Sequence, residues 1–229
     1  MNNCIDVSEF QKDIDWNAVK NAGVEYAFIR CGFGKSGIDK YFNINIEEAK
    51  AAGLKIGVYF YSYATDYDSA VAEAKHCIEL IEDYKNDINL PVFYDVEEEK
   101  NIPRITDVCM GFINTMNYYG YNCGIYTTGG WYSAYFKNIS TDYIWLAYLG
   151  STKPEWCDIW QYDWHGKIHG ILGDVDLDAV YNEDMKLLIH PDPPNEKDEI
   201  AHIIADLNHI IKEIKDIEER LIKYDNKED

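Results

Sequence analysis

Eight short apolar runs constrain the fold of this chain more than any other feature. Runs of this length, bounded by turn residues, are typical of buried β-strands. In the first half of the chain they alternate with segments of helical periodicity, which indicates parallel strands, and eight parallel strands can close into a barrel. The predicted strands are residues 4–8, 26–33, 55–64, 91–97, 123–128, 143–149, 158–163 and 174–180.

The helical patterns do not continue through the whole chain. Helices are predicted at 15–23, 42–53, 68–84 and 105–120, and only a short turn of helix fits at 131–136. The last three strands follow one another with little helix between them. This order predicts an α/β fold, an irregular TIM-like (β/α)5(β)3 barrel. An open doubly wound sheet is the alternative, but the sequence has no G-x-G-x-x-G or G-x-x-x-x-G-K-[ST] phosphate loop to favour it.

A Pro-rich segment, HPDPPNEKD at residues 190–198, marks a change in composition. Prolines at this density end a domain and form a stiff spacer. We therefore predict a barrel domain at 1–189, a linker at 190–198 and an amphipathic helix at 199–229. In that helix, apolar side chains recur in alternating steps of three and four, the seam of a coiled coil: Ile200, Ile203, Leu207, Ile210, Ile214, Ile217, Leu221 and Tyr224.

This heptad seam needs a partner, because four heptads cannot hide such an apolar stripe in water on their own. Strict heptads favour self-association, so we predict a homo-oligomer that forms through residues 200–224. A helix that lies back on its own barrel is the alternative. The number of chains in the coil stays open, because both Ile and Leu occupy the seam.

The strongly acidic composition argues against two kinds of partner. The formal net charge is −20, from 41 acidic and 21 basic residues. Nucleic-acid binding depends on Lys and Arg that neutralise phosphates, and anionic membranes attract basic segments. No window approaches the roughly 18 apolar residues of a membrane span. We therefore expect neither nucleic-acid binding nor membrane insertion.

The six cysteines form no C-x-x-C pair and no Cys/His cluster with zinc spacing. Most lie in apolar runs, where a free cysteine acts as a small apolar residue. We expect reduced thiols, no metal, no cofactor and synthesis in the cytoplasm. The N-terminal sequence MNNCIDVSEF lacks the basic and apolar segments of a signal peptide. An extracellular target would then require another factor that releases the protein.

Acidic residues lie where several predicted strands meet. Asp6 is near the end of the first strand, and Asp95 and Glu97 end the fourth. Asp176 and Asp178 lie in the eighth strand, which neighbours the first when the barrel closes. Active residues of parallel barrels sit at the C-terminal ends of the strands. Separate segments should therefore bring these carboxylates to one mouth of the barrel.

The alternation of side chains along a strand divides the acids of PVFYDVEEE. Phe93, Asp95 and Glu97 share one face, so Phe93 can fill the barrel interior below the two acids. Glu98 and Glu99 follow at the loop exit, where we expect plain solvated residues.

Carboxylates crowded at one mouth raise one another's pKa. A protonated acid beside ionised ones suits glycoside cleavage, because the acid protonates the leaving oxygen while its neighbour stabilises the sugar ring or acts as a nucleophile. A divalent metal site and plain loop-capping acids are the other interpretations. A ring of aromatic side chains near the strand ends favours a polysaccharide: Tyr59, Tyr61, Tyr63, Tyr126, Trp145, Tyr148, Trp160 and Tyr162.

With these residues in view, the sequence resembles the family 25 glycoside hydrolases, the Chalaropsis-type lysozymes that include many phage endolysins. The resemblance rests on ordered segments that span residues 4–181: IDVSEFQKDIDW, YAFIRCGFG, GVYFYSYA, PVFYDVEE, GIYTT, IWLAYLG, IWQY and GILGDVDLDAVY. It implies a (β/α)5(β)3 catalytic barrel. It also implies N-acetylmuramidase activity, the cleavage with retention of the β-1,4 bond between N-acetylmuramic acid and N-acetylglucosamine in bacterial peptidoglycan.

The resemblance also implies roles for individual residues. Glu97 matches the general acid/base, and Asp95 matches its partner, which is either a nucleophile or a support for the acetamido group of the substrate. Asp6 and Asp176 match two further acids of the site. Substrate or secondary polar contacts are implied for Tyr59, Tyr61, Tyr126, Tyr148, Gln161 and Arg30.

Two departures from the family pattern stand out. The sequence has VDLD where the family usually has VDLN, so Asp178 adds an acid at or near the mouth, and we assign it no catalytic role. The C-terminus is a heptad segment, whereas many such endolysins carry a wall-binding module there.

Two classes of function follow from the sequence. The first is an endolysin-like muramidase that is made in the cytoplasm and acts on the cell wall after release. The second is a non-catalytic wall- or sugar-binding protein whose tail multiplies weak sites. Release of soluble fragments from purified peptidoglycan discriminates between them.

Overall fold

The computed structural model divides into two compact units, Met1–His190 and Pro191–Asp229, which are considered separately. The predicted linker at 190–198 lies outside the residues that the structure describes. Those residues are 2–137, 139–186, 200, 203–204, 207–212, 214–215, 217–218 and 220.

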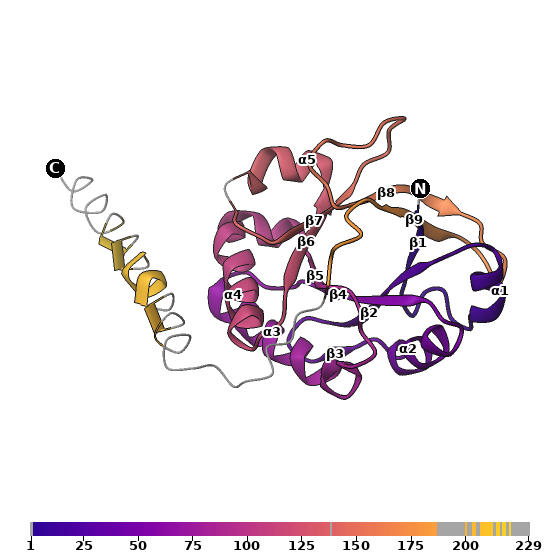
Figure 1. Cartoon of the computed structure of the whole chain (residues 1–229). Coiled ribbons are helices and arrows are strands. Elements are labelled where there is room, and N and C mark those ends of the chain that lie inside the picture. The colour runs from indigo at the N-terminus through magenta and orange to yellow at the C-terminus, as the bar shows by residue number, and fades with distance from the viewer. Residues whose placement is uncertain are drawn as a thin grey trace. The chain divides into compact units, whose positions relative to one another are not determined.

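The first unit is built on one sheet (Figure 1). Its strands are β1 (Asn2–Val7), β2 (Tyr26–Phe33), β3 (Gly37–Ile38), β4 (Lys55–Tyr61), β5 (Val92–Asp95), β6 (Cys123–Thr128), β7 (Tyr143–Ala147), β8 (Ile159–Gly166) and β9 (Val175–Val180). Their order is β1-β9-β8-β7-β6-β5-β4-β2-β3, and a further pairing of β1 with β2 closes the ring. The short β3 pairs only with β2, so eight strands form the barrel, as the sequence predicts.

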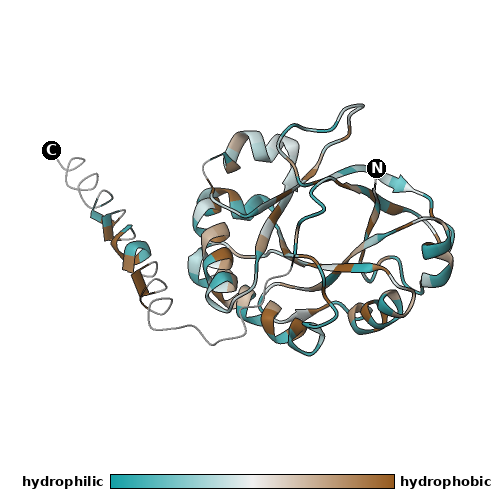
Figure 2. Ribbon diagram, in the orientation of Figure 1, coloured by the Kyte–Doolittle hydropathy of each residue, from teal (hydrophilic) through white to brown (hydrophobic). Residues whose placement is uncertain are grey.

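Helices cover the first part of the barrel, and the described residues between β7 and β9 form none. They are α1 (Trp16–Asn21), α2 (Phe42–Ala51), α3 (Tyr67–Ile81), η1 (Glu82–Tyr84), η2 (Glu99–Arg104), α4 (Ile105–Tyr118), α5 (Gly129–Trp131) and η3 (Tyr132–Phe136). The longer helices of the barrel, α2, α3 and α4, carry hydrophobic and hydrophilic residues together, as expected for a helix with one face on a sheet (Figure 2).

The last strand reverses direction. Barrel neighbours from β1 through β2 and β4 to β8 pair in parallel, whereas β9 is antiparallel to both β8 and β1. An antiparallel pair needs only a short connection, which explains why no crossover helix precedes β9. As a consequence, the beginning of β9, rather than its end, lies beside the C-terminal end of β1.

Local signals fix the ends of the helices. The Asp15 carboxylate accepts a hydrogen bond from the Ala18 amide at 3.0 Å and caps α1. Asp66 and Ser69 form a reciprocal capping box at the start of α3. Gly23 and Gly120 adopt positive φ angles of 92° and 85° just beyond α1 and α4, a conformation that glycine tolerates best.

Large rings fill the interior of the barrel. The Phe28 and Phe93 rings meet edge to face with centroids 5.4 Å apart, and Phe28 lies 4.8 Å from Trp145. Glycines make room for them, because a Cβ atom on Gly57 would approach Phe28 to 2.1 Å and one on Gly124 would approach Phe93 to 2.4 Å. The rings therefore form a solid floor beneath the mouth of the barrel.

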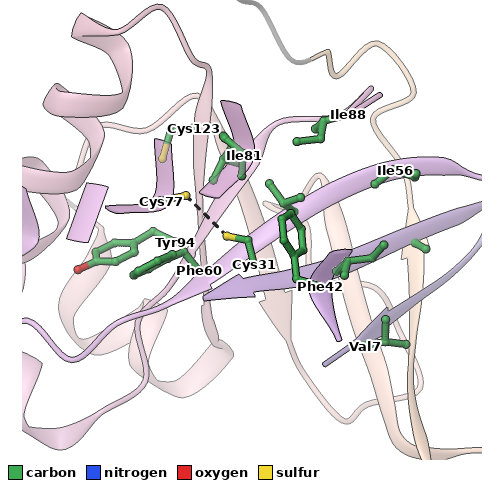
Figure 3. Packing of buried hydrophobic residues seen from close by; sticks show 14 of the residues in the cluster. Val7, Cys31, Phe42, Ile56, Phe60, Cys77, Ile81, Ile88, Tyr94 and Cys123 are labelled. Atoms are coloured by element: carbon green, nitrogen blue, oxygen red, sulfur yellow. Dashed lines mark hydrogen bonds between the residues drawn. The ribbon is translucent and has the colours of Figure 1, made fainter. Parts of the chain in front are cut away.

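A second apolar cluster lies between the strands and the surrounding helices (Figure 3). All six cysteines are free and buried, which confirms the expectation of unpaired thiols. The sulfur atoms of Cys31 and Cys77 lie 3.8 Å apart within this cluster (Figure 3). The cysteines thus serve as small apolar packing residues.

In the second unit, the described residues between 200 and 220 are helical. The remaining residues of the predicted helix at 199–229 lie outside the described part, so a continuous heptad helix stays a prediction. Among the described residues, no helix combines the length and apolar character needed to cross a membrane. In this second unit, the large apolar side chains that are 47% to 54% exposed are Ile200, Ile203, Ile204, Leu207, Ile210, Ile211, Ile214 and Ile217.

Candidate active site

A pocket of about 200 Å³ opens at the mouth of the barrel. All of the residues to which the resemblance gives a role line it except Tyr148, which follows β7 and is 48% exposed. Of the predicted aromatic ring, Tyr63, Trp160 and Tyr162 also lie outside the lining. The pocket thus brings together acids and aromatic residues from opposite sides of the barrel. Its lining residues are Asp6, Ser8, Phe10, Gln11, Arg30, Tyr59, Tyr61, Asp95, Glu97, Tyr126, Trp145, Gln161 and Asp176.

The end of β5 places two carboxylates in this pocket. Asp95 is the last residue of the strand and pairs with Tyr61 on β4 and Tyr126 on β6. The Val96 amide still donates to the Tyr126 carbonyl at 3.0 Å, so the alternation of side chains continues as far as Glu97. Asp95 and Glu97 therefore both face the pocket, as the period of two predicts.

A second pair of acids meets them from β1 and β9. Asp6 lies directly opposite Asp176 in the antiparallel register. The Gln161 side chain donates from Nε2 to Asp6 Oδ2 at 2.7 Å, and its Oε1 accepts from the Tyr126 hydroxyl at 2.9 Å. Gln161 thereby fixes both an acid and an aromatic wall of the pocket.

Arg30 anchors the loop that carries Phe10. Its Nε donates to Asp39 at 2.9 Å, and its Nη2 contacts Glu9 at 3.3 Å. The guanidinium also faces the rings of Phe10 and Phe33, at 5.2 Å and 5.4 Å from their centroids. Arg30 therefore holds the rim of the pocket in place through two ion pairs and two ring contacts.

The electrostatics favour protonation of the carboxyls at the end of β5. Burial raises the pKa of Asp95 well above its ordinary value, and repulsion from Glu97 and Asp6 adds to this, while Arg30 opposes it. Asp95 Oδ1 is buried without a hydrogen-bond partner. Burial also raises the pKa of Glu97, with contributions from Glu98 and Asp176.

The pKa values of the two acids on the opposite wall, Asp6 and Asp176, are raised as well. Burial, followed by repulsion from Asp176, raises the pKa of Asp6 well above its ordinary value, and the hydrogen bond from Gln161 partly offsets this. Burial raises the pKa of Asp176 to about 6, although the nearby His165 lowers it. A pocket with so many mutually repelling carboxyls holds at least one proton in weakly acidic solution.

Two acids outside the pocket lining differ from the sequence-based expectations. Glu98 is half-buried and its Oε1 accepts from the Tyr61 hydroxyl at 2.9 Å, so it is not the plain solvated residue expected. Asp178 is 1% exposed and accepts from Trp145 Nε1 at 2.8 Å. It lies deep in the wall of the barrel and not at the edge of the mouth.

The pocket is also lined by Ser8, Phe10 and Gln11, three loop residues that were not among the predicted site residues. They follow β1 directly, and loops after the C-terminal ends of barrel strands build the active site, so their position in the sequence is the signal that identifies them. Within the described part of the chain, no three His, Cys, Asp or Glu side chains are arranged to hold a metal ion.

Comparisons with known proteins agree with this architecture. The sequence model of glycosyl hydrolases family 25 matches residues 5–171. The chain is 30% identical over 217 residues to the autolytic lysozyme of Clostridium acetobutylicum, a match that covers 91% of this chain and 65% of that protein. The chain therefore spans just under two thirds of this relative.

Solved structures give the same result. A family 25 glycosyl hydrolase from Bacillus anthracis superposes with a TM-score of 0.68 and 27% identity, over 80% of this chain and 90% of that one. The modular autolysin LytC from Streptococcus pneumoniae, in complex with a synthetic peptidoglycan ligand, gives a TM-score of 0.68 and 27% identity, over 79% of this chain and 46% of LytC. The chain belongs to glycosyl hydrolase family 25.

Proposed function

We propose that the protein is an N-acetylmuramidase that cleaves the β-1,4 bond between N-acetylmuramic acid and N-acetylglucosamine in bacterial peptidoglycan. The observation that carries the proposal is the pocket that gathers Asp6, Asp95, Glu97 and Asp176 among aromatic walls. Membership of family 25 supports it, as do the likeness to an autolytic lysozyme and the peptidoglycan ligand bound by LytC.

In this proposal Glu97 is the general acid/base. Its raised pKa keeps a proton available in weakly acidic solution, and that proton passes to the oxygen of the leaving sugar. Asp95 lies beside it and has to give up the proton that burial favours on it, because the reaction needs its ionised form, either as a nucleophile or as a support for the acetamido group of the substrate. Asp6 and Asp176 complete the negative field that stabilises a positively charged sugar ring.

The aromatic and polar lining positions the sugar. Tyr59, Tyr61 and Tyr126 offer flat faces and hydroxyl groups along the pocket. Gln161 holds Tyr126 through the hydrogen bond described above, and Arg30 holds the loop that carries Phe10. A substrate contact for Tyr148 stays a prediction that requires a glycan chain extending beyond the pocket.

A pair of substitutions tests the proposal. Glu97→Gln removes the transferable proton while keeping shape, and we expect it to abolish the clearing of purified cell walls with folding intact. Glu99→Gln is the matched control, because Glu99 is exposed and does not line the pocket. A folded Glu97→Gln protein with full activity would refute the proposal.

The non-catalytic alternative, a multivalent wall- or sugar-binding protein, is not favoured. Four mutually repelling carboxyls in one pocket destabilise the fold, and acid chemistry gives a reason for such a cluster that sugar binding alone does not. Soluble fragments released from purified peptidoglycan support hydrolysis, whereas binding without release supports the alternative.

We further propose that residues 1–189 are the catalytic barrel, 190–198 a linker and 199–229 a helix that joins copies of the chain. The support is the half-exposed apolar side chains along the described positions between 200 and 220. Light scattering on the whole chain, compared with a chain that ends before Pro191, tests this. Two monomers would overturn the proposed homo-oligomer and favour a helix docked on its own barrel.

We also propose that the protein is made in the cytoplasm and reaches the wall with the help of another factor. Six buried free thiols support synthesis in a reducing compartment. Expression inside a susceptible bacterium, with and without a membrane-permeabilising agent, tests this, because lysis should require the agent. Lysis by the protein alone would contradict it.

A further inference from the structure

Asp178 is a buried acid that the proposed reaction does not use directly. It lies on β9, opposite Cys4 of β1 and Gln161 of β8, and its side chain is 1% exposed. Its Oδ1 accepts a hydrogen bond from Trp145 Nε1 at 2.8 Å. Its Oδ2 is buried and accepts no hydrogen bond.

The surroundings of Asp178 offer no compensation for a negative charge on Oδ2. Asp6 is close enough to share a hydrogen bond with Asp178 once one of the two carboxyls holds a proton. Among the described residues, the titratable groups that interact electrostatically with Asp178 are acidic: Cys4 and Asp6 on β1, Tyr126 on β6, Tyr162 on β8 and Asp176 on β9. Two ionised carboxylates in such a place repel one another strongly.

We propose that Asp178 is a neutral carboxylic acid whose Oδ2 hydrogen is donated to Asp6, and that it thereby positions Asp6 in the active site. The positioning role rests on the proposed muramidase function. Trp145 already donates to Oδ1, which leaves Oδ2 to carry the proton. Asp6 also accepts from Gln161, which makes Asp6 the better ionised partner of the pair.

This arrangement satisfies two requirements at once. It provides the buried Oδ2 with a partner and removes the repulsion between two carboxylates. Burial and the charge of Asp6 raise the pKa of Asp178 well above its ordinary value, although the bond from Trp145 opposes them, which agrees with the neutral form. Asp178 also fixes the Trp145 ring, which forms part of the pocket floor.

Because the proposed acid accepts at one oxygen and donates at the other, an asparagine side chain can reproduce both bonds. Asp178→Asn would accept from Trp145 with Oδ1 and donate to Asp6 with Nδ2. Asp178→Leu would keep the branching at Cγ, in a larger side chain, but make neither bond. The pair therefore separates the hydrogen-bond pattern from the negative charge.

The first measurement follows the side-chain carboxyl carbon of Asp178 by NMR, assigned by its loss in Asp178→Asn, between about pH 4 and about pH 8. We expect the shift of a protonated acid throughout the weakly acidic range. An ionised Asp178 in that range would overturn the proposal. The measurement needs no substrate, so its outcome is independent of whether the protein is a muramidase.

The second measurement compares the pH profiles of kcat/KM on peptidoglycan fragments. We expect Asp178→Leu to lose about tenfold or more in kcat/KM, because Asp6 loses one of its two donors, and Asp178→Asn to rescue most of that loss. Asp178→Asn should also stay active at alkaline pH values where the wild type declines through ionisation of Asp178. Equal losses in the two variants would show that the charge of Asp178 is required and would refute the proposal.

Discussion

Buried carboxylates lie on both sides of β5, and their hydrogen bonding differs. On the face toward the helices, Glu73 of α3 is 1% exposed and accepts hydrogen bonds from the Tyr94 hydroxyl at 2.6 Å and the Tyr63 amide at 2.8 Å. On the pocket face, Asp95 is 5% exposed, yet one of its oxygens has no hydrogen-bond partner, and the charges of Glu97 and Asp6 outweigh that of Arg30. Burial is therefore common to both, and hydrogen-bond donors distinguish them.

Hydrogen bonds on the helix side of β5 help to hold the residues on its pocket side in place. Ser62 Oγ donates to the Tyr94 hydroxyl at 2.8 Å, and Asn101 Nδ2 donates to the Ala64 carbonyl at 2.7 Å. Asn101 Oδ1 then accepts from the Glu98 amide at 2.9 Å. The network behind the barrel thus reaches the loop that carries Glu97 and holds it against the repulsion within the pocket.

The largest expected effect is on the pocket side. Asp95→Asn should lower kcat by about 10²–10⁴-fold, because the reaction loses an ionised partner for Glu97. The same change should leave the melting temperature unchanged or raise it, since it removes a buried carboxyl that lacks donors. Kinetics and thermal unfolding on one preparation test both. A clear loss of stability would mean that Asp95 is as well satisfied as Glu73.

The next effect concerns the helix side. Glu73→Leu should lower the free energy of unfolding by about 1–3 kcal/mol, because it leaves the Tyr63 amide and Tyr94 hydroxyl without their acceptor. Glu79→Gln on the exposed face of α3 is the control, with an expected change within about 0.5 kcal/mol. Urea denaturation measures both. Equal stability of the two variants would contradict the structural role of Glu73.

A smaller effect is the pH dependence of stability. An acid with a raised pKa in the folded state contributes stability below its unfolded pKa, and this contribution is lost as pH rises through the folded value. For Asp176 the window runs from about 4 to about 6, so the wild type should become less stable over that range and Asp176→Asn should flatten the slope.

Asp174 provides the matched control of opposite sign. Hydrogen bonds from Lys167 and His165 lower its pKa, so its contribution is present at neutral pH and is lost as pH falls. Asp174→Asn should therefore leave the decline between about pH 4 and about pH 6 in place. Denaturation midpoints at several pH values measure both variants, and a steeper decline in Asp176→Asn would refute the sign.

The smallest effect is expected at Glu98, which does not line the pocket but whose charge raises the pKa of Glu97. Glu98→Gln keeps an acceptor for the Tyr61 hydroxyl and removes a charge that raises the pKa of Glu97. The alkaline limb of the kcat/KM profile should then move to lower pH. A shift to higher pH would show that Glu98 does not influence Glu97 through its charge.

The sequence predicts most of the barrel because period and alternation are local properties. The strand at 91–97 has a period of two, and this alone separates Asp95 and Glu97 from Glu98. It does not reveal that Tyr61 reaches across to Glu98, because that contact depends on the conformation of the loop after β5.

The direction of β9 determines how deep Asp178 lies below the mouth of the barrel. The sequence places Asp176 and Asp178 on one face, but β9 runs antiparallel to β1, so the chain descends from the mouth and Asp178 pairs with Cys4 below Asp6.

Tyr148 follows β7, which ends at Ala147, and its ring lies outside the pocket. Strand direction and strand ends of this kind are set by packing, which a single sequence does not display.

The identity of the reducing end released from defined peptidoglycan tests the central claim most directly. The proposed chemistry predicts that the wild type generates reducing N-acetylmuramic acid and that Glu97→Gln generates none. Reducing N-acetylglucosamine would identify a glucosaminidase, and the absence of new reducing ends would leave a binding protein. Either result would contradict the assignment of the pocket to muramidase chemistry.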